Sequence, residues 1–482
     1  MGMSFYTSRI VLDTLGVENF GIYEVVGGVV GIFSFLNASM SGATSRFLNF
    51  ALGKGDKEEF QKTFSASLTI QILIALFILI LAETVGLWFL ENKLVIAPER
   101  MNAARVVYQL SIVSTMVMIM QVPYTATIFA HERMNIFAFI EILNVSLKLC
   151  IVFLLIGPWD KLVLYAALLF VVSCLIAGTY RLYCIKQFKE CKYRFEWNKK
   201  VIYPMLSYSG WDFIGTGAYV GANQGINILL NLFFGALVNA AYGIANMVKN
   251  ATNSFVRNFQ MAVTPQIIKL YAAEKTNELF SLVFQSVLIS FSLTWLLLLP
   301  VSLHLETLLQ IWLVEVPDYT VLFCRLVLAH SIISCIQRPF VEIIHATGKM
   351  KVFQLSAGTV LLSVLPVSYF FLKAGGATHI PFLVYIGATL LELLVELYLL
   401  KRWINLPLVT LFKTVFIPIF FIVLCTLPVS VLVSYYFPFM LSVLFSVLLI
   451  CISAYFIALT KETRTKVIQY IKNILNKSNL QK

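Results

Sequence analysis

The chain has 482 residues, of which 59% are hydrophobic and 12% are charged, and its formal net charge at neutral pH is +12. Soluble domains carry about a quarter charged residues, so this composition excludes an ordinary soluble protein. Lipid offers no partner for unpaired backbone groups, and a helix satisfies them within a single segment. The long apolar runs therefore predict an all-α polytopic membrane protein.

Apolar runs long enough to cross a bilayer, about 20 residues each, recur along the whole chain. In chain order they predict thirteen complete membrane segments, at about 18–50, 62–90, 102–130, 135–157, 161–183, 202–231, 238–268, 279–303, 319–346, 352–373, 379–400, 410–434 and 438–460. A shorter apolar stretch at 1–14 precedes them. It does not have the pattern of a signal peptide, because it has neither a basic region before an apolar core nor a small-residue cleavage site after it.

Lysine and arginine are distributed unequally between the two sides of the predicted membrane. Alternate connections and the tail place 24 of them on one side and five on the other. Such a bias marks the richer side as cytoplasmic, which puts the C-terminus in the cytoplasm. Orientation therefore accounts for the positive net charge, and no nucleic acid is expected as a partner. The tail 461–482 repeats apolar residues at helical spacing among lysines, which predicts a segment lying on the anionic inner leaflet.

The sequence contains an internal repeat. The run VPYTATIFAHERMNIF, which begins at Val122, aligns without a gap with RPFVEIIHATGKMKVF, which begins at Arg338. A weaker similarity at nearly the same shift relates Asn19 to Asn239 and Glu58 to Glu278. One period covers six membrane segments, so the two copies share one orientation. Parallel repeats of this kind are typical of transporters whose substrate path lies between the halves.

The repeat predicts two pseudo-symmetric six-helix lobes and two further helices. The expected parts are an N-terminal lobe at 1–188, a basic cytoplasmic linker at 189–201, a C-terminal lobe at 202–402, the extra helices at 403–460 and the amphipathic tail at 461–482. In this alignment the stretch 1–14 matches the outer end of the helix that opens the second lobe. The first helix is therefore expected to be incomplete.

Polar residues form stripes at helical spacing on three predicted segments. On 238–268 the stripe is Asn246, Lys249, Asn250, Asn253, Arg257 and Gln260. On 202–231 it is Asp212, Thr216, Tyr219, Asn223 and Asn227. A weaker one on 18–50 is Ser34, Asn37, Ser41, Ser45 and Arg46. One interpretation is polar contact between helices, worth about 0.6 kcal/mol per hydrogen bond. The other is a water-filled cleft, which we favour for 238–268 because its stripe holds two cations and three asparagines.

Charges elsewhere in the membrane segments are weaker evidence for a site. Arg338 and Glu342 stand four residues apart and are candidates for a simple ion pair. Glu392 and Glu396 share one helix face and are expected to pair or to extend toward the interface. The five histidines form no metal-binding pattern, and the sequence has no P-loop or nucleophile motif. We therefore expect no enzyme, no catalytic residue, no metal and no cofactor.

Two runs resemble bacterial polysaccharide exporters. They are TSRIVLDTLGVENFGIYEVVGGVVGIFSFLNASMSGATSRFLNFALGKGD at 7–56 and FGALVNAAYGIANMVKNATNSFVRNFQMAVTPQIIKLYAAEK at 234–275. The resemblance is to the O-antigen and capsule flippases of the multidrug/oligosaccharidyl-lipid/polysaccharide (MOP) superfamily. It implies that the stretch 1–14 and the segments 18–50, 202–231 and 238–268 line a central cleft. It also implies cleft cations at Arg46, Lys249 and Arg257.

The resemblance implies a transporter of the bacterial inner membrane that works by alternating access. Its substrate would be an oligosaccharide linked to undecaprenyl pyrophosphate, whose phosphates need cations. Association with a polysaccharide polymerase or glycosyltransferases would follow from the same role. Asp212 and Glu141 are the candidates for coupling transport to an ion. A multidrug or cation antiporter of the same fold, which would favour an acidic cleft, is the alternative function.

Overall fold

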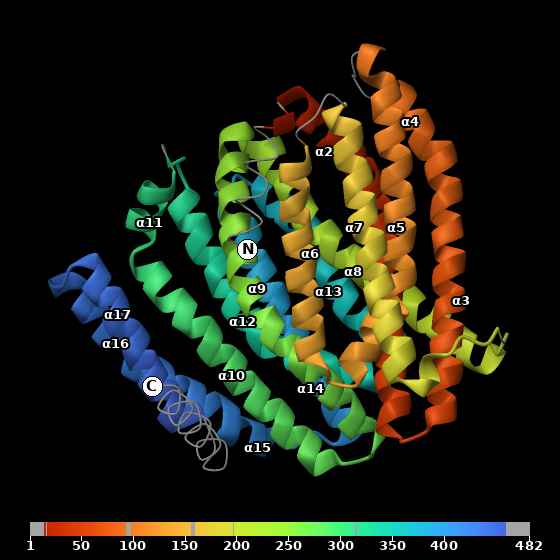
Figure 1. Ribbon diagram of the computed structural model, residues 1–482. Helices are drawn as coiled ribbons and strands as arrows, with labels where there is room; N and C mark the ends of the chain where they lie inside the picture. The colour runs from red at the N-terminus through yellow and green to blue at the C-terminus, as the bar shows by residue number, and fades with distance from the viewer. Residues whose placement is uncertain are drawn as a thin grey trace, which may run out of the picture. The chain divides into compact units, whose positions relative to one another are not determined.

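The computed structural model describes residues 14–15, 17–92, 98–155, 160–195, 197–313 and 316–458, and every long regular element in these ranges is a helix (Figure 1). Each of the thirteen predicted membrane segments coincides with helix, so the all-α expectation is confirmed. The stretch 1–14, apart from residue 14, and the tail 461–482 lie outside the described residues. The chain divides into two compact units, Met1–Phe213 and Ile214–Lys482. This boundary falls within a helix, whereas the linker predicted from sequence is 189–201.

The described residues of unit 1 form long helices and one short helix. They are α2 (Val17–Gly53), α3 (Lys57–Leu81), α4 (Leu87–Asn92), α5 (Met101–Ala130), α6 (Met134–Leu154) and α7 (Lys161–Gln187). A π-helical turn, Ala82–Gly86, joins α3 to α4, so the predicted segment 62–90 is helical throughout. Buried residues of α2, α3, α5, α6 and α7 form one apolar core, with Phe60, Phe64 and Tyr180 among its largest members.

Unit 2 begins inside α8 (Lys199–Phe234). Its further helices are α9 (Ala236–Ala272), α10 (Thr276–Leu303), α11 (Leu305–Trp312), α12 (Thr320–Thr347), α13 (Met350–Lys373), α14 (Ile380–Ile404), α15 (Leu408–Leu411), α16 (Ile417–Tyr436) and α17 (Phe439–Ser453). The sequence did not predict α11, an amphipathic helix that is too short to cross lipid and that buries Leu305 and Leu309. It lies in the connection between the predicted segments 279–303 and 319–346.

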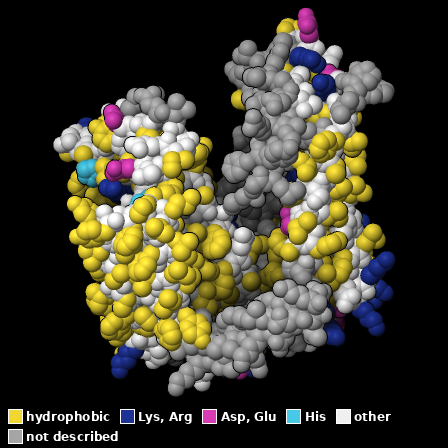
Figure 2. Space-filling view, turned by 60° about the vertical axis from the view of Figure 1, so that its left-hand side comes forward, with side chains coloured by type: hydrophobic (Ala, Val, Ile, Leu, Met, Phe, Trp, Pro, Cys, Tyr) yellow, Lys and Arg dark blue, Asp and Glu magenta, His cyan; other side chains and the backbone are white. Residues whose placement is uncertain are grey.

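Among the described residues, ten helical stretches are long and apolar enough to span a membrane. Figure 2 shows hydrophobic side chains over the middle of the visible surface, with charged side chains gathered mainly toward the ends. The helices α16 and α17 contribute exposed apolar side chains such as Phe420, Leu432 and Met440. This distribution is the one that lipid requires. The helices α8 and α9 are not among the ten, although they have 36 and 37 residues, because asparagines and charges interrupt their apolar runs.

Two glycines let α8 pack closely against α13 within unit 2. A Cβ atom at Gly215 would lie 1.8 Å from Gln354 Oε1, and one at Gly225 would lie 2.2 Å from a methyl carbon of Leu365. Small residues allow backbones to approach in this way in membrane helices. Asn223, which lies in the pocket around Lys249, stands two residues before Gly225 on α8.

The turns between helices follow the sequence repeat. Glu132 ends α5 with a φ of 56°, and the equivalent residue in the repeat, Gly348, ends α12 with a φ of 73°. Two residues before α3, Gly55 has a φ of 74°, and at the same place before α10, Glu274 has a φ of 58°, one residue out of register with the weaker sequence similarity. Each pair therefore places one glutamate in the left-handed region, where a Cβ atom costs about 1–2 kcal/mol.

Replacing Glu274 by glycine is expected to stabilise the protein, because it removes the Cβ clash at a left-handed position. The expected gain is about 1 kcal/mol, which corresponds to a rise of about 1–2 °C in the unfolding midpoint of the purified protein. The control is Glu274→Ala, which removes the charge but keeps the Cβ atom, and which should give no such gain. Equal midpoints for both variants would contradict this explanation.

Candidate functional site

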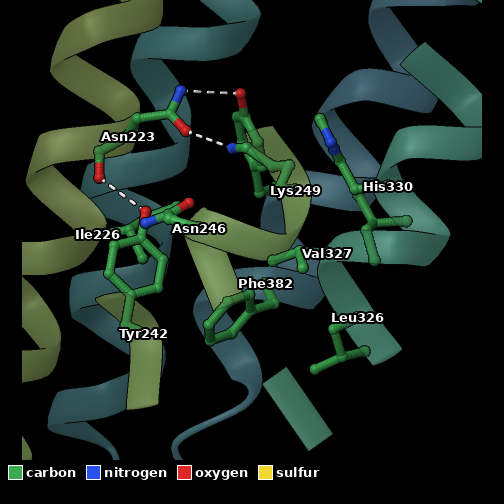
Figure 3. Close-up of a pocket in the computed structure, with 11 residues that line it drawn as sticks. Asn223, Ile226, Tyr242, Asn246, Lys249, Leu326, Val327, His330 and Phe382 are labelled. Carbon is green, nitrogen blue, oxygen red and sulfur yellow. Dashed lines mark hydrogen bonds between the residues drawn. The ribbon is translucent and has the colours of Figure 1, made fainter. Parts of the chain in front are cut away.

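A buried lysine lies among polar side chains of four helices in unit 2. Lys249 on α9 is 6% exposed, and the pocket around it is lined by residues of α8, α9, α12 and α14. The lining residues are Asn223, Ile226, Tyr242, Asn246, Lys249, Leu326, Val327, His330, Phe382, Tyr385 and Ile386 (Figure 3). Of the predicted stripe on α9, the pocket therefore receives Asn246 and Lys249.

The asparagine at position 223 orients the lysine. Its Oδ1 accepts a hydrogen bond of 2.9 Å from Lys249 Nζ, and its Nδ2 donates to Tyr385 Oη at 3.1 Å and to the Tyr219 carbonyl at 2.9 Å. Tyr242 Oη donates to the Asn223 backbone carbonyl at 3.0 Å. Figure 3 shows the bonds from Asn223 to Lys249 and Tyr242. Both polar atoms of the side-chain amide and the backbone carbonyl are thereby engaged, so Asn223 is held in one orientation.

A histidine and a tyrosine form the wall opposite Lys249. The Tyr385 ring centroid lies 5.9 Å from Lys249 Nζ, which is within the range of a cation–π contact. The His330 ring stacks on the Tyr385 ring with their centroids 4.5 Å apart, and His330 Nε2 lies 3.2 Å from Thr389 Oγ1. Both rings are buried. The helical spacing on α9 could not indicate these residues, because they come from α12 and α14, far along the chain.

The charge of Lys249 is not balanced locally. Among the described residues, no carboxylate forms an ion pair with its Nζ, although such pairs form elsewhere in unit 2. An ammonium group has three N–H donors, and the described contacts of Lys249 use one of them. Removing such a charge from water costs several kcal/mol. The arrangement therefore favours an anion as ligand. The pocket has room for about one water molecule in this conformation.

Two other predicted site residues lie near each other on α2 and α8 within unit 1. The Arg46 guanidinium lies 4.6 Å from the Phe47 ring centroid and 5.4 Å from that of Tyr208. Asp212 Oδ2 lies against Gly42, where an added Cβ atom would be 3.7 Å away. One turn earlier on both helices, the Ser39 and Ser209 hydroxyls are 3.1 Å apart. Within unit 1, this part of α2 therefore faces the first half of α8 through polar and aromatic side chains.

The remaining candidates are outside the Lys249 pocket. Asn250 and Arg257 on α9 are exposed, and Asn227 and Asn253 are half-buried. The side chain of Asn37 lies outside the described residues. In unit 1, Glu141 is half-buried on α6 and accepts a hydrogen bond of 3.4 Å from Tyr180 Oη on α7. Within the described residues, no group of three His, Cys, Asp or Glu side chains has the geometry to hold a metal ion.

Solved structures with the same fold are membrane transporters. One, a crystal structure of a MATE mutant, has a TM-score of 0.71 at 12% identity over 86% of this chain and 94% of that one. Another, an outward-facing multidrug resistance MATE family transporter of the MOP superfamily, has a TM-score of 0.67 at 13% identity over 84% and 93%. A MOP superfamily transporter from Pyrococcus furiosus, described as having a binding pocket of reverse polarity, gives 0.68 at 12% over the same shares. These identities show the fold alone.

Sequence comparison adds the family. The family described as "Polysaccharide biosynthesis protein" matches residues 1–271, which is more than half of the chain. The uncharacterized membrane protein EpsK of Bacillus subtilis is 22% identical over 250 residues, which cover 50% of this chain and 48% of EpsK. This chain therefore belongs to the polysaccharide biosynthesis protein family, and its fold is that of the transporters described above.

Replacing Lys249 by glutamine is expected to stabilise the purified protein in the absence of ligand. Glutamine can still donate to Asn223 Oδ1, but it removes a buried charge that lacks a counter-ion. We expect the free energy of unfolding to rise by about 1 kcal/mol, measured as a higher unfolding midpoint.

The matched control is Lys275→Gln, because Lys275 is exposed and lies 3.0 Å from Glu278. An exposed ion pair contributes little to stability, so Lys275→Gln should alter the free energy of unfolding by less than about 1 kcal/mol. A lower unfolding midpoint for Lys249→Gln than for the wild type would show that Lys249 stabilises the folded protein.

Proposed function

We propose that this protein is a flippase that moves a lipid-linked oligosaccharide across the bacterial inner membrane, with its C-terminus in the cytoplasm. The observation that carries the proposal is Lys249, a buried cation with spare donors and no carboxylate partner among the described residues. The family supports a role in polysaccharide synthesis, and the distribution of lysine and arginine supports the orientation.

The chemistry of an undecaprenyl pyrophosphate-linked glycan fits this pocket. The pyrophosphate needs charged donors, which Lys249 provides, and the amide groups of Asn223 and Asn246 suit oxygen-rich groups beside it. The polyprenyl tail can remain in lipid while the head group crosses. The barrier that the protein lowers is then the desolvation of the head group.

Alternating access follows from the size of the pocket. Space for about one water molecule admits no pyrophosphate, so the conformation described here is closed around Lys249. Substrate binding then requires α9 to separate from the wall that Tyr385 and His330 form. The contacts that must break are the Lys249–Asn223 and Asn223–Tyr385 hydrogen bonds.

A multidrug or cation antiporter is the alternative for this fold, because a solved structure of similar fold is described as a multidrug resistance transporter. The pocket argues against it. A buried lysine without a neighbouring carboxylate repels a cationic substrate, and it gains energy only from an anion.

Transport measurements on Lys249→Gln test the proposal. In proteoliposomes that carry a fluorescent lipid-linked oligosaccharide, the rate of transfer is followed by the access of a membrane-impermeant reagent. Loss of a charge-assisted contact worth about 1.5–3 kcal/mol should slow transfer by about 10–100-fold. Lys275→Gln should remain within about two-fold of the wild type, because its charge lies outside the pocket.

The same variants separate the two functions. Equal transfer rates for Lys249→Gln and the wild type would contradict the flippase proposal, as would uptake of cationic drugs without transfer of the lipid-linked glycan. Comparable expression of both variants, and an unfolding midpoint of Lys249→Gln that is no lower than that of the wild type, ensure that a slower rate reflects the site.

A further inference from the structure

A carboxyl group is buried between α12 and α14 without a matching cation. Glu396 on α14 is 0% exposed, and its Oε1 accepts a hydrogen bond of 2.8 Å from Gln337 Nε2 on α12. Its second oxygen, Oε2, is also buried and has no hydrogen-bond partner among the described residues. The expectation that this glutamate extends toward the interface is therefore wrong for Glu396, because Gln337 packs against it inside unit 2.

Two side-chain contacts between α12 and α14 define the seam in which Glu396 lies. The pairs His330–Thr389 and Gln337–Glu396 are both separated by 59 residues, and they follow each other by two helical turns. This constant separation means that α12 and α14 run parallel and in register. The seam extends from the wall of the Lys249 pocket to Glu396, so both groups are in contact with the same two helices.

The charged groups near Glu396 do not balance the negative charge that it would carry if it were ionised. Those that act on it are Glu392, one turn earlier on α14, and Arg338, which follows Gln337 on α12. Arg338 Nε lies 3.0 Å from Glu342 Oε1, and Glu342 is itself buried while Arg338 is 56% exposed. Arg338 therefore forms its ion pair with Glu342. On α13, which also packs against α14, the charged residues Lys351 and Lys373 stand near the two ends. Lys401 and Arg402 lie in the last turn of α14.

An ionised carboxylate in this position would be very costly. It would have one neutral amide donor, an unpaired oxygen and a neighbouring glutamate of the same sign, and burying an isolated charge is far more expensive than burying a neutral acid. A bound metal cation is disfavoured, because sodium-like or calcium-like ions need several oxygen ligands, and the described residues provide no acidic cluster here.

We propose that Glu396 is a proton-binding site and is a neutral carboxylic acid in this conformation. The proton lies on Oε2, the oxygen without a partner, while Oε1 keeps the hydrogen bond from Gln337. The proton is taken up from water, and it is released when α12 and α14 separate and water reaches the carboxyl group. This site lies beyond the proposed function and does not depend on which substrate the pocket near Lys249 binds.

Infrared spectroscopy of the purified protein at neutral pH tests the protonation directly, without any transport assay. A protonated carboxyl group has a C=O stretching band that a carboxylate lacks. The wild-type protein should show such a band, and Glu396→Gln should lose it. Glu342→Gln is the matched control, because Glu342 is also buried on the neighbouring helix but is paired with Arg338. The band should be unchanged in that variant. An unchanged band in Glu396→Gln would overturn the proposal.

A second variant provides an independent readout if Glu396→Gln does not fold. Gln337→Leu removes the donor to Oε1 but leaves the acid in place. Loss of that hydrogen bond strengthens the C=O bond, so the band should remain and move to higher frequency. Absence of a protonated-carboxyl band, or a band at the wild-type frequency, would show that Glu396 does not carry the proton next to Gln337.

Discussion

The constraint on which unit 2 depends is a positive charge held away from both water and a counter-ion. Lys249 is held there because Asn223 accepts from it, and Asn223 is fixed in turn by Tyr385, Tyr219 and Tyr242. A neutral side chain at this position would cost less free energy to bury than a charged one. In the proposed function, the ligand supplies the missing negative charge.

Glu396 is a second buried titratable group within the same unit, and it is an acid. The parallel seam between α12 and α14 connects the two, because it carries His330 beside the Lys249 pocket and Gln337 beside Glu396. A movement that opens this seam would expose both groups to water. Anion binding at Lys249 and proton release at Glu396 would then respond to one conformational change, which is the requirement for coupling two sites through a two-state element.

The helices and part of the site could be predicted from the sequence because both depend on local periodicity. Hydrophobic runs located the membrane segments, and the i, i+3, i+4 spacing on α9 placed Asn246 and Lys249 on one face. Tyr385 could not be found in this way, since it meets Asn223 across 162 residues of sequence. Glu396 was misjudged for the same reason: its helix position was clear, but the packing of Gln337 on it was not. The helix α11 was missed because its eight residues are too few to be recognised as a membrane segment, and they lie in a predicted connection.

The most direct test of the account is the binding of a pyrophosphate-bearing lipid to the purified protein. Undecaprenyl pyrophosphate-linked oligosaccharide is titrated into wild-type protein and Lys249→Gln, alongside a lipid of the same tail and glycan that lacks phosphate. We predict that the wild type prefers the pyrophosphate lipid by about 10-fold or more, as a charge-assisted contact requires, and that Lys249→Gln abolishes this preference. An equal preference in the two proteins would contradict the assignment of Lys249 as the anion-binding residue.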